Sequence, residues 1–178
     1  MSRTAQELTP SWLLTALGLV ATAGITAACW TAGHVQADAS LLTVARFFHI
    51  AFLVVGLGSV LAVDWFAVLW LTGKRPLSGV LDTAVALQTP IWAGLGGLVV
   101  SGLFLRPDLH SPLTLVKLGL VLAVTLNGLW AHRLGQLLAA HRSTAVPRRL
   151  LVLSGLAATV SQAGWWGASL IGFLNSQS

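Results

Sequence analysis

Residues 41–71 read LLTVARFFHIAFLVVGLGSVLAVDWFAVLWL, and this stretch decides the fold class. It is longer than the roughly 20 apolar residues that a helix needs to cross a bilayer. Its only charged residues are Arg46 and Asp64. The stretch therefore predicts a transmembrane helix that is tilted or whose first turns extend into the membrane interface.

The composition of the whole chain agrees with that prediction. Hydrophobic residues make up 56% of the 178 residues and charged residues only 8%, with a mean hydropathy of +0.83. A soluble domain has roughly 25% charged residues. We therefore expect an all-α, polytopic integral membrane protein whose partner is the lipid bilayer. The net charge of +5 does not indicate a nucleic-acid partner, because the basic residues gather in loops between apolar runs.

Five apolar runs joined by short loops predict five transmembrane helices in a single domain, 1–178. The first run could be read as a signal peptide, but it is longer than the roughly 7–15 apolar residues of such a peptide. No internal repeat is evident. The expected spans are about 12–30, 41–71, 80–105, 113–139 and 150–174.

The distribution of Lys and Arg predicts how the bundle is oriented. Arg106 is the only Lys or Arg in the loops after the first and third spans, whereas the other side carries Arg3, Lys74, Arg75, Arg142, Arg148 and Arg149. Because basic loops stay in the cytoplasm, we expect a cytoplasmic N-terminus and a C-terminus outside. The expected location is a cell membrane, and the compact loops favour a bacterial plasma membrane.

Two spans carry ionisable residues at the same spacing. His49 and Asp64 lie 15 residues apart in the second span, and Lys117 and His132 lie 15 apart in the fourth. Fifteen residues return to nearly the same helix face and rise about 22 Å. If these spans, which run in the same direction, pack side by side, the two pairs lie at matching depths. His49 and Lys117 would then form an outer layer, and Asp64 and His132 an inner layer.

Ionisable groups inside a membrane usually have a function. For Asp64 and His132, with Asn127 between the layers, a proton relay and a buried ion pair that fixes helix register are both open. Arg46, one turn before His49, joins the outer layer.

Several outer-layer residues have a second interpretation. Lys117 and Arg46 could instead extend to the lipid headgroups, whereas the imidazole of His49 is too short to do so. Cys29, His34, His110 and His49 lie toward one side of the membrane and are together a candidate zinc or copper site. Their spacing matches no known metal-binding motif.

Two segments resemble a known family. The segments RFFHIAFL at 46–53 and GLG at 56–58 resemble the histidine-bearing helix of the membrane-bound protoporphyrinogen oxidase family and of related copper resistance D-type proteins. The segment LVKLGLV at 115–121 is similar to the lysine-bearing helix of that oxidase family. The resemblance implies a small helical bundle in which His49 binds haem and Lys117 is functionally important. The chain departs from the family in having no tyrosine, no arginine-rich third helix and an extra first span, which puts the oxidase activity in doubt.

Functions from different classes therefore remain open. In the first, the chain is a redox protein associated with haem b or a quinone, with His49 as the metal ligand and with Lys117 and Arg46 neutralising acidic groups. In the second, it binds no cofactor and is an accessory subunit whose glycine-rich segments 94–97 and 164–172 pack against other membrane subunits or a second copy. A small transporter is a third possibility, although paired broken helices are missing. Whether the chain is an enzyme stays open.

Overall fold

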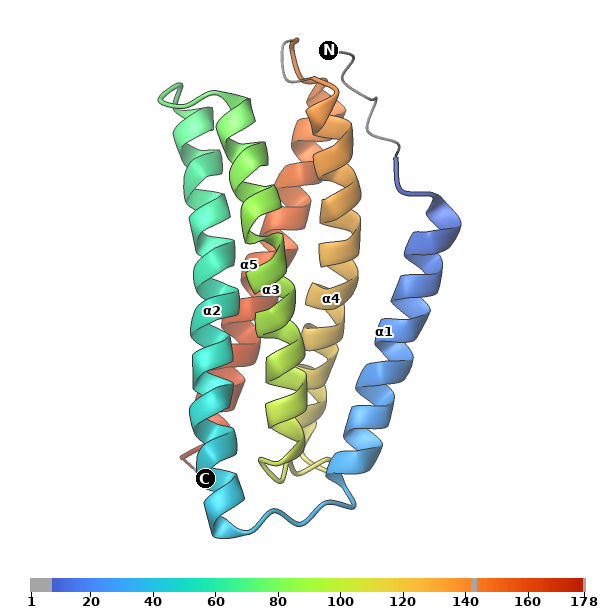
Figure 1. The fold of residues 1–178 in the computed structure, drawn as a ribbon, viewed down its shortest axis with the longest axis vertical. Helices are drawn as coiled ribbons and strands as arrows, with labels where there is room; N and C mark the ends of the chain where they lie inside the picture. Colours follow the sequence, from blue (N-terminus) through green and yellow to red (C-terminus); the bar gives the residue numbers. More distant parts are fainter. Residues whose placement is uncertain (1–7, 142–143, 178) are drawn as a thin grey trace.

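The computed structural model describes residues 8–141 and 144–177, which form long α-helices and no strands (Figure 1). This confirms the all-α prediction, and each helix coincides with one predicted apolar run. Arg3 and Arg142, which entered the orientation argument, lie outside the described residues. The helices are α1 Ser11–Ala32, α2 Ala39–Leu71, α3 Leu77–Leu103, α4 Pro112–Ala139 and α5 Arg148–Asn175.

Proline or a capping carboxylate marks the start of each helix. Pro10, Pro76 and Pro147 directly precede α1, α3 and α5, and Pro112 is the first residue of α4. Proline suits these positions because its φ is already helical and its missing N–H would have no partner there. Asp38 caps α2 by accepting a hydrogen bond from the Leu41 N–H at 2.7 Å. The position at which each helix begins is therefore determined by residues at that position in the sequence.

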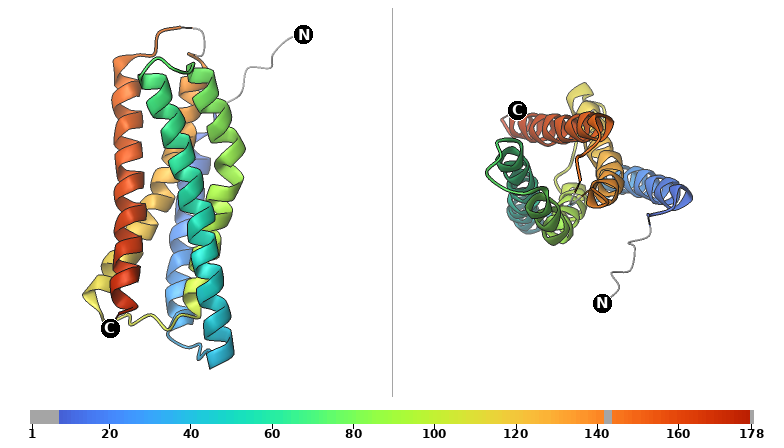
Figure 2. Two further views of the ribbon diagram at one scale, coloured as in Figure 1. Left: turned by 90° about the vertical axis from the view of Figure 1, so that its left-hand side faces the viewer. Right: turned by 90° about the horizontal axis from the view of Figure 1, so that it is seen from above.

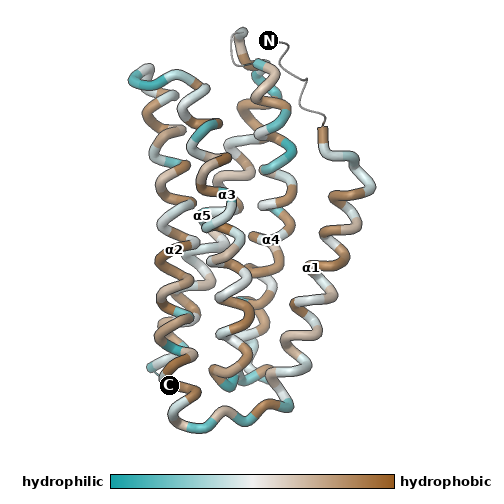
Figure 3. Tube along the Cα trace, viewed as in Figure 1, coloured by the Kyte–Doolittle hydropathy of each residue, from teal (hydrophilic) through white to brown (hydrophobic). Residues whose placement is uncertain are grey.

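Four of the helices, α1 to α4, are long and apolar enough to cross a membrane. The apolar residues run along the middle of the helices, and the hydrophilic ones concentrate near their ends (Figure 3). Large apolar side chains such as Trp12, Phe47 and Leu71 are about 70% exposed, an arrangement that suits lipid and not water. α5 has 28 residues but is less apolar and is not among the four.

Consecutive helices pack as antiparallel pairs. α2 packs along α3, α4 packs along α5, and α1 lies beside α4 and α3 (Figures 1 and 2). α2 does not make an extensive contact with α4, so the side-by-side packing on which the two layers depended is not formed. Short connections bring α3 back beside α2 and α5 back beside α4, so within each pair sequence neighbours are also spatial neighbours.

Glycines let α2 and α3 approach closely. The ring of Phe52 covers Gly97, and the backbone of Gly56 lies against Gly94. A Cβ added at Gly94 would lie 2.5 Å from the Gly56 Cα, so no larger residue fits there without separating the helices. Further along the same interface, the imidazole of His49 faces Gly102.

The α4–α5 pair repeats this packing residue for residue. Leu120 covers Gly167, Val124 lies against Gly164, and Lys117 faces Gly172. The three α4 residues follow their α2 counterparts by 68 positions, and the three α5 glycines follow their α3 counterparts by 70. The bundle of α2 to α5 is therefore an internal repeat of one helical hairpin, in which Lys117 occupies the place of His49. The sequence analysis missed this repeat.

Tryptophans join the two helix pairs. Trp165 of α5 reaches Gly56 of α2, and Trp92 of α3 reaches Gly128 of α4. Trp165 is only 4% exposed and belongs to the buried cluster at the centre of the bundle, with Val60, Leu95 and Val124. The second helix of each pair, α3 or α5, thus places one tryptophan ring against a glycine of the other pair.

Candidate functional site

His49 is held in one orientation by α3. Its Nδ1 lies 2.8 Å from the Oγ of Ser101, which is buried at 5% exposure. The Ser101 hydroxyl already donates its single proton to the Gly97 carbonyl at 2.6 Å. With this hydroxyl hydrogen on the Gly97 carbonyl, Nδ1 of His49 carries the ring hydrogen and donates to Ser101. This tautomer leaves Nε2 unprotonated, which is the form that binds metal ions.

Lys117 lies half-buried on α4 and has no counter-ion within the described residues. Its Nζ faces Gly172 of α5, at 3.4 Å from where a Cβ would stand, and it is close enough to His49 for electrostatic interaction. Among the residues that the structure describes, no carboxylate or carbonyl accepts a hydrogen bond from this ammonium. The structure thus brings the two outer-layer residues near each other, although each one packs against the second helix of its own pair.

Arg46 lies one helical turn before His49, where its side chain is exposed. It is on the same end of the bundle as Lys117, because α2 and α4 both begin there (Figure 1). Two cations, Arg46 and Lys117, are thus at the end of the bundle where His49 lies. We call His49, Ser101, Lys117 and Arg46 the His49 site.

Asp64 and His132 have separate partners, so the predicted inner-layer pair is not formed. Gln162 of α5 donates its Nε2 hydrogen to the Asp64 carboxylate at 2.5 Å. His132 instead lies between two glutamine amides, with Gln88 of α3 at 2.9 Å and Gln136 of α4 at 3.1 Å. The physical reason is that α2 and α4 make no extensive contact, so Asp64 meets a glutamine of α5 and His132 meets glutamines of α3 and of α4 itself.

Asn127 does not connect the two layers. Its side-chain amide donates to the Ala157 carbonyl of α5 at 2.8 Å. This bond joins the two helices of one pair, and we interpret it as a packing contact. The glutamines that do contact the ionisable residues were missed by the sequence analysis, although uncharged polar residues in apolar runs were the available signal.

The histidines and the cysteine near the outer loops do not gather around a metal position. His34 bonds to the Trp30 carbonyl and stacks on the Trp30 ring. No group of three metal-ligating residues occurs in 8–141 and 144–177. The idea of a zinc or copper site shared by Cys29, His34, His110 and His49 is therefore not supported by the described part of the chain.

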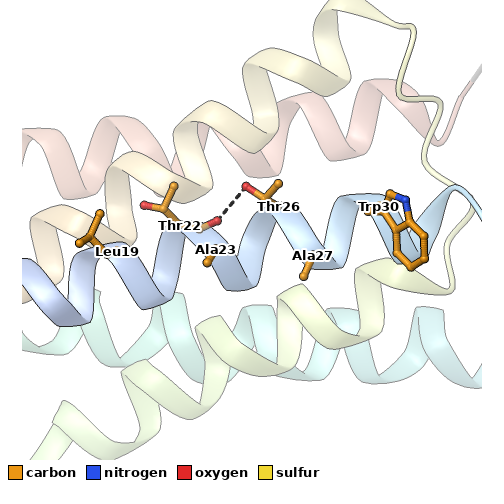
Figure 4. Close-up of a pocket in the computed structure, with 6 residues that line it drawn as sticks. All are labelled: Leu19, Thr22, Ala23, Thr26, Ala27 and Trp30. Carbon is orange, nitrogen blue, oxygen red and sulfur yellow. Dashed lines mark hydrogen bonds between the residues drawn. The ribbon is translucent and has the colours of Figure 1, made fainter.

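The two main hollows of the surface lie along α1, away from the His49 site. One is lined by α1 alone, from Leu19 to Trp30, where Thr26 bonds back to the Thr22 carbonyl (Figure 4). The other is a groove between α1 and α4 that ends near Arg133. Both are shallow and open, as expected of helix surfaces that face lipid.

Comparisons with known proteins give no relative: no family model matches the chain, and neither does any curated protein or solved structure. The resemblance to the protoporphyrinogen oxidase family stays a prediction.

Proposed function

We propose that this chain is a multi-pass membrane protein that holds an anionic redox cofactor, haem b, at the His49 site. The proposal rests on the His49 imidazole, whose Nδ1 faces Ser101, and on the nearby half-buried Lys117 ammonium, which has no acceptor among the described residues. A haem needs an axial ligand and cations for its two propionates. Nε2 of His49 suits the iron, and Lys117 and Arg46 suit the propionates.

The depth of the site also suits an amphiphilic cofactor. His49 lies ten residues into α2 and Lys117 five residues into α4, which corresponds to about 15 Å and about 8 Å from the helix starts. The exposed rings of Phe47 and Phe48 flank His49 and offer apolar surface to a porphyrin. The iron would lie in the apolar layer, and the haem propionates would point toward the headgroups. When bound, haem supplies one-electron transfer.

The residues around His49 support this assignment in a second way. Ligating histidines usually donate their other ring N–H to a fixed acceptor, which sets the tautomer and the ring orientation. Ser101 provides that acceptor on α3 and is itself fixed by the Gly97 carbonyl. His49 is thus prepared to bind before any cofactor arrives.

The membrane arrangement is part of the proposal. We infer that α5 is the fifth span, because it is as long as α4 and packs along it. Lys74, Arg75, Arg148 and Arg149 lie at the end of the bundle where α1 begins (Figure 1). The positive-inside rule then favours a cytoplasmic N-terminus in a plasma membrane of bacterial type.

A non-enzymatic accessory subunit is the second candidate. It is favoured by the close glycine packing beside His49 and by the position of both main hollows along α1, away from this site. In that case the exposed apolar faces would contact other membrane subunits or a second copy.

A visible absorption spectrum separates the two candidates. The protein, purified in mild detergent and supplied with hemin, is measured oxidised and after dithionite reduction. We expect a Soret band in the wild type and in the control His34→Ala, whose histidine lies at the same end of the bundle, and its loss in His49→Ala. A wild type that keeps no Soret band after unbound hemin has been removed would favour the accessory subunit.

A further inference from the structure

A cluster of polar side chains holds the start of α1 against α4. Thr9, just before α1, bonds to Gln136 of α4 through both its backbone N–H, at 2.9 Å, and its hydroxyl, at 2.8 Å. Gln136 in turn contacts His132 at 3.1 Å, and His132 contacts Gln88 of α3 at 2.9 Å. Three separate segments therefore meet at one histidine.

The orientation of the Gln136 amide is fixed by Thr9. A backbone N–H can only donate, so the atom that faces Thr9 N must be the amide oxygen. The amide nitrogen of Gln136 then faces Nε2 of His132 as a donor. Nε2 must accept this bond, and it can do so only without a proton.

The other ring nitrogen completes the assignment. In a neutral imidazole whose Nε2 accepts, the hydrogen is on Nδ1. The Gln88 amide beside Nδ1 must then present its oxygen, which requires only that its oxygen and nitrogen exchange places by rotation. When His132 is neutral, every donor in this cluster faces an acceptor. The cluster consists of Thr9, Gln136, His132 and Gln88.

Protonation of His132 breaks this arrangement. An imidazolium donates from both nitrogens, so Nε2–H would point at the NH₂ group of Gln136. Gln136 can accept that bond only by turning its amide, which places its NH₂ group against the N–H of Thr9. We propose that His132 is a proton-binding site that controls the docking of α1: binding of a proton releases Thr9 from Gln136.

Asp64 of α2 has a related arrangement, which it forms with side chains of α5. Asp64 precedes His132 by 68 residues, the offset of the internal repeat. There the indole N–H of Trp166, a donor only, fixes the oxygen of Gln162 at 2.9 Å, so that the Gln162 NH₂ group faces Asp64. Asp64 and His132 thus each face the NH₂ group of a glutamine whose amide is oriented by a donor, and both of these glutamines lie on the α4–α5 pair.

The charged groups on the surrounding helices do not take part in this cluster. On α4, Arg133 lines the groove toward α1, and His141 bonds to the Leu137 carbonyl. On α3, Asp82 is exposed and has an interaction of its own. On α2, Asp64 bonds to Gln162 of α5. Within the described ranges, only the two glutamines bond to His132, so its protonation acts through their amides.

The weak attachment of α1 makes release measurable. Its contacts with α3 and α4 are few compared with those inside each pair, and much of its surface is exposed. Spin labels at Leu8→Cys and Ala140→Cys, in a Cys29→Ser background, report the distance between the start of α1 and the end of α4. Double electron–electron resonance is recorded at about pH 8 and about pH 5, the limits between which histidines ordinarily change charge.

We expect one narrow distance population at the higher pH and its loss at the lower pH. His132→Ala should keep the narrow population at both pH values, because Gln136 stays bonded to Thr9. Gln136→Leu should lack it at both. The control His141→Ala should respond as the wild type does. An unchanged distribution in the wild type, or a pH response that persists in His132→Ala, would overturn the proposal.

Discussion

The glycine contact between α2 and α3 gives the sharpest prediction about stability. In Gly94→Ala the new Cβ would lie 2.5 Å from the Gly56 Cα and 2.9 Å from the Phe52 carbonyl oxygen. Both are backbone atoms of a packed helix, so they can move only if the helices separate. Overpacking of this kind costs about 1–3 kcal/mol.

The neighbouring Gly96 provides a matched control, because a Cβ there meets nothing within 4 Å. Both substitutions gain the same helix propensity, up to about 1 kcal/mol, so the difference between the variants isolates the strain. For a chain of this size, about 1–3 kcal/mol corresponds to roughly 2–12 °C in Tm.

The assay is thermal unfolding in detergent, followed by circular dichroism. Gly94→Ala should melt below the wild type or close to it, and several degrees below Gly96→Ala. Equal melting temperatures for the two variants would refute the close approach of α2 and α3. In the second pair, Gly164→Ala should be milder, because the nearest atom is a methyl group of Val124 that can rotate away.

Further predictions concern the polar contacts. In a double-mutant cycle, Asp64→Asn and Gln162→Leu should be coupled by about 0.5–3 kcal/mol, whereas Asp64→Asn and His132→Ala should be additive; the opposite pattern would contradict the assigned partners. The Leu41 N–H and the Ser40 hydroxyl lower the pKa of Asp38, so its capping contribution is present above the unfolded pKa of about 3.9 and is lost as the pH falls through the lower folded value. If the free energy of unfolding is measured against pH, Asp38→Ala should lose the part of the acid-side decrease that comes from this cap. A curve identical to that of the wild type would contradict the capping role.

Much of the fold could be predicted because its signals are local. Each helix begins at a proline or at Asp38, and each apolar run is long enough for one helix. The neighbour of each helix could not be predicted in the same way. In a membrane the lipid-facing and protein-facing sides are both apolar, so hydrophobic periodicity does not reveal which face is packed.

The candidate site could be predicted in part, for the same reason. The spacing of His49 and Asp64 correctly places them far apart along one helix, but the spacing cannot reveal that Gln162 comes from α5 to meet Asp64. The internal repeat could not be recognised from the sequence because equivalent positions make the same packing contacts with different residue types. His49 and Lys117 are different residue types, and their equivalence appears only when each is seen facing a glycine of its partner helix.

A hemin titration of the purified protein, followed at the Soret band, tests the central claim most directly. The account predicts saturable binding that is abolished in His49→Ala and is weakened about tenfold, or about 1.4 kcal/mol, in Lys117→Met. Lys74→Met, a substitution in the α2–α3 loop at the opposite end of the bundle, should bind as the wild type does. Equal affinity in all four proteins, or no binding in any of them, would contradict the assignment of His49 and Lys117 as a cofactor site.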